Sequence, residues 1–223
     1  MKFDNAKEII TDKEKLAEWC YEIDPVKNGK KTQEIILALK DTMRANNLLS
    51  LSAPQLGYDS RIICIRFGDN DYRTFINPMI DNNVNLTMSR ESCSSIPGKE
   101  FIIPRFNNIK FYFTTPLGKP ESATLVGQAA FVFQHELDHL NGLLVEDIGL
   151  EIDELFDQAT DEEREQVVQM YAESLDIRLK NLNEDMSGNK ELSDLNDAIK
   201  FINSVKDGST VLESAEKTKE TKD

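Results

Sequence analysis

The chain has 223 residues, of which 39% are hydrophobic, and its 26 Lys and Arg against 40 Asp and Glu give a formal net charge of −14. This length allows one well-buried core with an appendage, and the composition excludes a short peptide, a fibre and a membrane span. Residues 1–10 are rich in charge, and no apolar run approaches the roughly 18 residues of a transmembrane helix. We therefore expect a cytoplasmic protein that does not associate with membranes.

Cysteine usage supports the same compartment. The three cysteines, Cys20, Cys64 and Cys93, are an odd number at wide spacing. This pattern favours a reducing environment over a disulfide framework. Cys20 and Cys64 stand among apolar residues and are expected to be small core side chains.

The first helical spacing falls at residues 11–21 and the second at 32–46, where Ile35, Leu39 and Met43 share one face. The middle of the chain has β character in three segments separated by Gly, Asn, Asp and Pro: residues 62–67, 74–78 and 109–113. We expect these segments to be short antiparallel strands.

Residues 127–140 predict a buried helix, which Asn141 and Gly142 would end. The order of these elements predicts an α+β fold with antiparallel β-sheets around this central helix, followed by a C-terminal helical extension.

The last third of the chain is the most acidic part, with 9 basic and 20 acidic side chains in residues 150–223 against 17 and 20 in residues 1–149. Thr160 and Glu163 predict a capping box. Apolar stripes of helical spacing follow at Val167, Tyr171, Leu175, Leu179 and Leu182, and at Leu192, Leu195, Ile199 and Ile202. We expect an acidic helical extension over residues 151–206 and a disordered tail over 207–223.

Both histidines of the chain, His135 and His139, lie in one short segment with Glu136 between them. Positions i and i+4 share a helix face, so both imidazoles can bind one metal ion while the carboxylate reaches a water beside it. Two ordinary helix histidines are the alternative interpretation.

A catalytic ion needs at least a third protein ligand and one open coordination position. Many carboxylates qualify, and so does Cys93. Its neighbours, residues 90–98, are polar, small and turn-forming, which is unusual for a merely buried cysteine.

A third segment, Ala53-Pro54-Gln55, would alone be read as a turn. In chain order, Ala-Pro-Gln, then Glu-x-Cys-x-Ser at 91–95, then His-Glu-x-Asp-His-Leu at 135–140 resembles the three-motif signature of the peptide deformylases. The matched spacing runs over residues 48–147. The generic zinc peptidases share only the His-Glu-x-x-His part.

The resemblance implies that residues 1–150 form a catalytic domain that removes the formyl group from the N-terminal formyl-methionine of nascent polypeptides. It implies that Cys93, His135 and His139 bind one divalent metal ion, with Fe²⁺ most effective and Zn²⁺, Ni²⁺ or Co²⁺ as substitutes. Glu136 would be the acid/base. Gln55 and the backbone N–H of Ser94 would stabilise the oxyanion.

The sequence departs from the family's motifs at three glycines, which are replaced by Leu48, Ser50 and Ser92. A position that needs positive φ would be strained by a side chain. Glu100 stands where many relatives have a substrate-binding arginine, whereas Arg105 is retained and could pair with Glu91.

Two alternatives to an active deformylase remain at this point. One is a His-Glu-x-x-His peptidase that cuts internal peptide bonds, and the other is a non-catalytic or altered-specificity homologue that acts by binding a protein. Bacterial relatives use a basic terminal helix to dock on the ribosome. Because the corresponding part of this chain is acidic, we expect weak, salt-insensitive ribosome association and no sequence-specific nucleic-acid binding.

Overall fold

The structure is a computed structural model that describes residues 3–153, 156 and 158–166. These residues belong to two units, one made of residues up to 85 with 89–151, and the other made of 86–88 with the residues from 152 onward. The first unit contains the predicted site.

A six-stranded sheet forms the frame of the first unit. Its strands are β1 (Ser50–Ser52), β2 (Ile62–Arg66), β3 (Tyr72–Cys93), β4 (Ile96–Thr114), β5 (Pro120–Val126) and β6 (Leu150–Ile152). They follow the order β1-β2-β3-β4-β5, and β6 pairs with β4. The β1/β2, β2/β3 and β4/β5 pairs are antiparallel.

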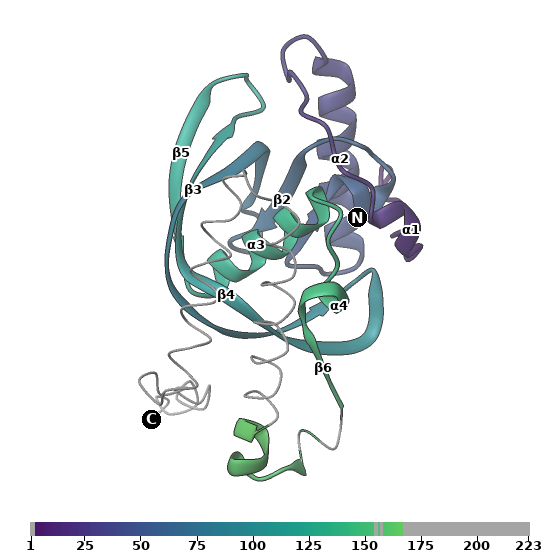
Figure 1. Cartoon of the computed structure of the whole chain (residues 1–223). Coiled ribbons are helices and arrows are strands. Elements are labelled where there is room, and N and C mark those ends of the chain that lie inside the picture. The colour runs from purple at the N-terminus through teal and green to yellow at the C-terminus, as the bar shows by residue number, and fades with distance from the viewer. Residues whose placement is uncertain (1–2, 154–155, 157, 167–223) are drawn as a thin grey trace, which may run out of the picture. The chain divides into compact units, whose positions relative to one another are not determined.

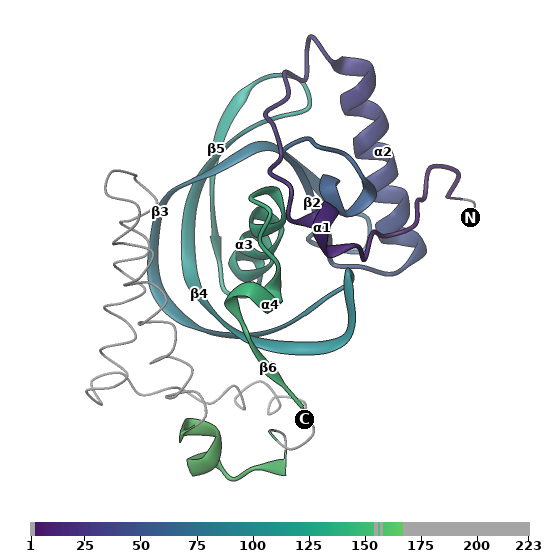
Figure 2. The ribbon, with the colours of Figure 1, turned by 45° about the vertical axis from the view of Figure 1, so that its right-hand side comes forward.

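Helix α3 (Gln128–Leu140) runs along the concave side of the long, curved strands, as Figures 1 and 2 show. The other helices are α1 (Lys13–Leu16), α2 (Gly29–Ala45), the 3₁₀ helix η1 (Ala53–Leu56) and α4 (Val145–Ile148). The predicted antiparallel sheet around a central helix is therefore confirmed.

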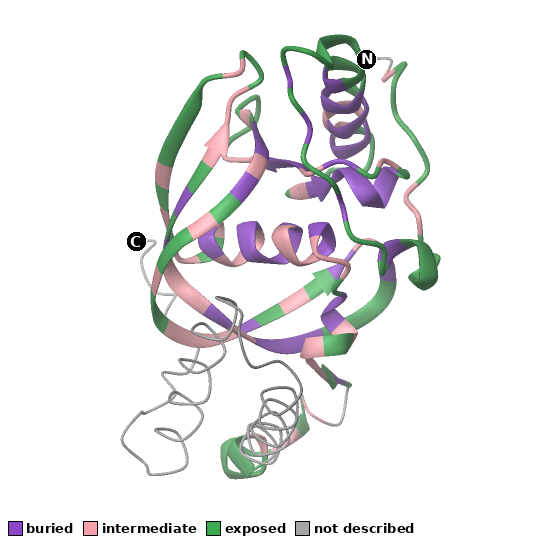
Figure 3. Cartoon of the chain, turned by 45° about the horizontal axis from the view of Figure 1, so that its top comes forward, coloured by how far each residue is buried: buried purple, intermediate pink, exposed green. Residues whose placement is uncertain are grey.

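Aromatic side chains hold α3 against the sheet. Phe133 of α3 lies 4.1 Å from Phe111 of β4 and 5.8 Å from Phe75 of β3, measured between ring centroids. All three rings are almost fully buried, and Figure 3 shows buried positions along α3. Aromatic pairs in such geometry stabilise a fold beyond their area burial. These contacts fix the orientation of α3 on its apolar side, and so also the direction of its polar face.

Helix α2 follows the predicted pattern with a start three residues earlier than expected, and Ile35, Leu39 and Met43 are fully buried on one face. Cys20 and Cys64 are buried as predicted, and burial raises the pKa of each thiol to about 11.

Two predictions of secondary structure are wrong. The helix expected over residues 11–21 is a single turn, because the chain then extends and the backbone N–H of Cys20 bonds to the carbonyl of Leu140. The strands expected at 74–78 and 109–113 are parts of much longer ones, of 22 and 19 residues. Exposed polar side chains on a solvent-facing strand do not interrupt the backbone ladder, and Asn77 takes up a local irregularity with φ 48°.

Among the described residues of the second unit, the capping box predicted at Thr160 is confirmed. Its backbone N–H donates to Glu163 at 2.8 Å, and Glu163 donates its own N–H to the Thr160 hydroxyl at 3.3 Å. The apolar stripes from Val167 onward and the predicted tail 207–223 lie outside the described residues. None of the helices in the described part of the chain combines the length and apolar character that a membrane span requires.

Candidate metal centre

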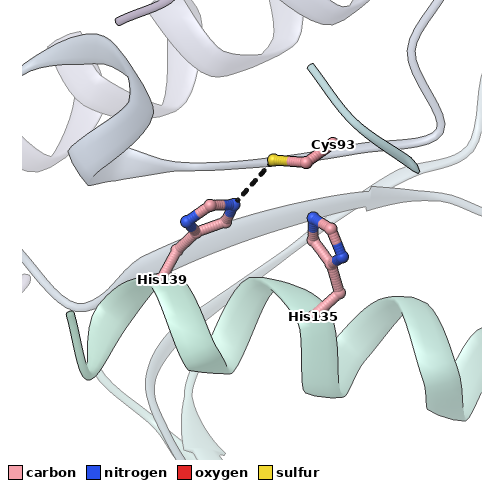
Figure 4. A group of neighbouring side chains, drawn as sticks. All are labelled: Cys93, His135 and His139. Carbon is pink, nitrogen blue, oxygen red and sulfur yellow. Dashed lines mark hydrogen bonds between the residues drawn. The ribbon is translucent and has the colours of Figure 1, made fainter. Parts of the chain in front are cut away.

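Helix α3 presents His135 and His139 on one face, one turn apart (Figure 4), with 5.1 Å between ring centroids. Their exposed fractions are 9% and 1%. The i, i+4 spacing produces this arrangement directly, because such positions lie one above the other on an α-helix. Both imidazoles can therefore bind the same ion.

Cys93 is the last residue of β3, immediately before the turn that starts β4, and its sulfur points at the two imidazoles (Figure 4). The Sγ atom lies 3.2 Å from Nε2 of His139. The candidate ligand atoms of Cys93, His135 and His139 all lie within 4.8 Å of one another. Zinc-type ions bind thiolate sulfur at about 2.3 Å and imidazole nitrogen at about 2.0–2.1 Å, so ligand atoms around one ion lie about 3 to 4 Å apart. This donor set fits a divalent ion.

A buried ion-pair network orients His135 from behind. Its Nδ1 lies 3.0 Å from Glu91 Oε2, which leaves Nε2 for a ligand. Arg105 donates to both oxygens of Glu91, at 2.8 and 3.0 Å, and to Asp138 at 2.5 Å. The pairing of Arg105 with Glu91 predicted from the sequence is confirmed. A carboxylate behind a ligating histidine fixes the tautomer and the ring orientation.

This network shifts the pKa values of Glu91, His135 and His139 in different directions when no metal is bound. Burial works to raise the pKa of Glu91, but hydrogen bonds from His135 and Arg105 lower it to about 2. Burial lowers the pKa of His135, yet hydrogen bonds with Cys93 and Glu91 outweigh it and raise the value to about 10. Burial and the charges of His135 and Arg105 hold the pKa of His139 well below its usual value. An imidazole nitrogen binds an ion only in its deprotonated form, so metal affinity at this site depends on pH.

Glu136 sits between the two histidines with 2% of its surface exposed. Its Oε1 accepts a hydrogen bond of 2.6 Å from the hydroxyl of Ser50, whereas Oε2 is buried and has no partner within the described part of the chain. Burial raises the pKa of Glu136, against the charge of His135 and the hydrogen bond from Ser50. An orphan carboxylate oxygen beside a candidate metal centre is the arrangement that a proton-transferring group needs.

Gln55, on η1, is oriented by Ser52. The backbone N–H and the hydroxyl of Ser52 both donate to Gln55 Oε1, at 2.9 and 3.0 Å. The amide nitrogen therefore faces the other way and donates to the hydroxyls of Ser95 at 3.2 Å and Ser94 at 3.3 Å, with the sulfur of Cys93 at 3.9 Å. A donor beside the candidate ligands can stabilise a developing oxyanion.

The structure thus brings together Cys93, His135, His139, Glu136, Gln55 and Ser94. The contact of Ser94 is made by its side-chain hydroxyl, and the role of its backbone N–H stays a prediction. Sequence reasoning missed the roles of Ser50, Ser52 and Asp138 as hydrogen-bond partners. The period-two spacing of the two serines on a strand could have indicated that their side chains share one face.

The replaced glycines cause no backbone strain. The non-glycine residues with positive φ in the described part are Asn47, Asn77 and Asn85, so Leu48, Ser50 and Ser92 all lie in ordinary regions. Glu100 is exposed and forms an ion pair with Arg90. The departures therefore change the side chains of this part without bending its backbone.

A model of the polypeptide deformylase family matches residues 6–150. The chain belongs to this family. A peptide deformylase from Dictyoglomus turgidum is 34% identical over 125 residues, which cover 56% of this chain and 81% of that protein. The chain is therefore a peptide deformylase, a hydrolase that acts in protein biosynthesis.

Solved deformylases share the fold. The Thermotoga maritima peptide deformylase is 31% identical, with a TM-score of 0.56 over 64% of this chain and 97% of that one. The deformylase of a Vibrio parahaemolyticus bacteriophage, solved in complex with actinonin, is 29% identical, with a TM-score of 0.56 over 62% of this chain and 98% of that one. Deformylases depend on a metal, and the Cys93, His135 and His139 group is a possible site for it. The peptidase and non-catalytic alternatives are not favoured.

Proposed function

We propose that this deformylase hydrolyses the formyl group of N-formyl-methionyl peptides at the site formed by Cys93, His135, His139 and Glu136. The observation that carries the proposal is the convergence of three ligand atoms within 4.8 Å beside a buried carboxylate with one free oxygen. Each of these groups is almost fully buried, which favours a catalytic site over an adventitious metal site on the surface.

Cys93, His135 and His139 would hold one divalent ion, with Fe²⁺ as our first choice and Zn²⁺, Ni²⁺ or Co²⁺ as substitutes. One thiolate with two imidazoles suits iron, nickel and zinc better than the hard ions Mg²⁺ or Ca²⁺. When bound, the ion would supply Lewis-acid activation of water and of the formyl carbonyl.

Glu136 would accept the proton of the attacking water at Oε2 and later donate it to the departing amine. The water oxygen bonds to the formyl carbon, the carbon–nitrogen bond breaks, and formate and the free methionine amine are the products. Its buried position, which raises its pKa, suits a group that both takes and gives a proton.

Gln55 Nε2 and the backbone N–H of Ser94 would donate hydrogen bonds to the carbonyl oxygen as negative charge develops there. Gln55 is prepared for this role because Ser52 holds its other amide atom. A donor that is already aimed costs no reorganisation during the reaction.

The test is formate release from a formyl-Met peptide by protein loaded anaerobically with Fe²⁺, or with Ni²⁺. We expect turnover with the formyl peptide and none with its acetyl-Met counterpart. Glu136→Gln should lose about 10²- to 10⁴-fold in rate while keeping the ion. Full activity of this variant would remove Glu136 from the mechanism, and no formate from the wild-type protein would overturn the proposed function.

We also propose that the enzyme acts on nascent chains in the cytoplasm with only weak attachment to ribosomes. Residues 150–223 carry 20 acidic against 9 basic side chains, which ribosomal RNA repels. Co-sedimentation with ribosomes should stay weak between 50 and 200 mM salt, about the range over which phosphate-driven binding changes steeply. Binding that strengthens sharply at low salt would contradict this proposal.

A further inference from the structure

Strand β1 presents two hydroxyl groups to the catalytic side chains. Ser50 and Ser52 lie two positions apart, so their side chains share one face of the strand, while Leu51 between them is fully buried in the core. Pairing with β2 fixes the backbone of all three residues, with Ser50 opposite Ile65 and Ser52 opposite Ile63. The hydroxyls are therefore held by the sheet and not by a mobile loop.

Ser52 acts on Gln55, as described above, and Ser50 acts on Glu136 from a position 86 residues away in the chain. The 2.6 Å distance between Ser50 Oγ and Glu136 Oε1 is that of a short O–H···O hydrogen bond. The terminal torsion of a glutamate is broad, so burial alone does not select one orientation of its carboxylate plane. A fixed donor on one oxygen does select it.

The motif that this chain resembles has glycine where Ser50 stands, and glycine offers no side-chain donor. We propose that Ser50 is a positioning residue for Glu136. Its hydroxyl holds Oε1 and thereby directs Oε2, the oxygen without a partner, toward the reacting water. This inference rests on the proposed function, because it assigns Glu136 the proton transfer.

The first test compares Ser50→Ala with Ser50→Thr, which keeps a hydroxyl on the same strand position. We expect Ser50→Ala to lower kcat for formate release about tenfold, the loss expected for one hydrogen bond to a charged group, with KM and bound metal unchanged. Ser50→Thr should restore most of kcat. Thr32→Val removes another buried hydroxyl, one without a partner in the described residues, and should leave kcat unchanged.

The second test measures the contact without catalysis. In metal-free protein, urea unfolding of Ser50→Ala, Glu136→Ala and the double variant should show coupling between the two sites, whereas two independent losses would simply add. Additive losses would overturn the proposal, as would a Ser50→Ala enzyme with unchanged kcat or with a change in KM alone. A wild-type chain that releases no formate would instead overturn the proposed function, and the role of Ser50 with it.

Discussion

Helix α3 carries Glu136 and two of the proposed metal ligands, whereas strand β1 supplies the hydroxyls that bond to Glu136 and Gln55. On α3, and at Cys93, the residues match the deformylase motifs. On β1, the motif's glycine is replaced by Ser50. The two parts of the site thus differ in how closely this chain follows the motif.

The difference has a physical origin. Three ligands around one ion must agree on distance and direction to within a few tenths of an ångström, so a substitution at any of the three changes the metal centre directly. A strand that only borders the reacting groups must leave space for the substrate and provide hydrogen bonds for neighbouring polar side chains. The small hydroxyl side chains of Ser50 and Ser52 meet both requirements, and the backbone of these residues is extended and unstrained.

Removing a ligand should give the largest effect. Cys93→Ala leaves two imidazoles, too few to hold a catalytic ion, so we expect the bound metal to be lost and formate release to fall to the level of metal-free protein. Metal analysis after gel filtration measures it. Cys20→Ala, which changes a buried cysteine outside the site, is the control and should keep one ion per chain. Retention of the ion by Cys93→Ala would favour the peptidase alternative.

On the β1 side of the site, substitution of Gln55 should have the largest effect on the rate. Gln55→Ala removes the donor that Ser52 orients, and should lower kcat about 10²- to 10³-fold with the metal retained. Steady-state formate release measures it, with Gln33→Ala on the exposed face of α2 as the matched control. If the loss were in metal content instead, Gln55 would belong to the ligand side of the site and the comparison would fail.

Substitution of Glu91 tests whether the hydrogen-bond partner of a metal ligand contributes to metal affinity. Glu91→Gln weakens the carboxylate that orients His135 and leaves part of the charge of Arg105 unpaired, so the dissociation constant for Zn²⁺ or Co²⁺ should rise about 10- to 100-fold. Chelator competition measures it. Glu100→Gln makes the same change in an exposed ion pair and should leave the affinity unaltered. An equal affinity in both variants would confine the ligand side to Cys93, His135 and His139.

Much of this site was readable from the sequence because its ligands follow local rules. His135 and His139 converge through helix periodicity alone, and the apolar residues of α3 predict that the helix is buried. The pairing of Arg105 with Glu91 was also predicted from the sequence, and the structure shows it.

Other features depend on long-range pairing, which the sequence hides. The length of β3 and β4 comes from ladder hydrogen bonds that do not depend on side-chain polarity. The helix expected over 11–21 stops after one turn because Cys20 bonds to Leu140, a contact set by the tertiary fold. Likewise, nothing near Ser50 in the sequence indicates that its hydroxyl meets Glu136.

The smallest effect concerns the strand next to β1 in the sheet, where Cys64 of β2 lies opposite Leu51. Burial raises the pKa of Cys64 from the ordinary thiol value of 9.0 to about 11, so in this interval the folded thiol stays neutral while an exposed thiol ionises. The stabilisation is complete below pH 9 and is lost as pH rises toward 11. Urea unfolding of metal-free protein should show the wild type losing about 2 kcal/mol more than Cys64→Ala over this interval. Equal pH slopes would show that burial does not raise the pKa of the Cys64 thiol.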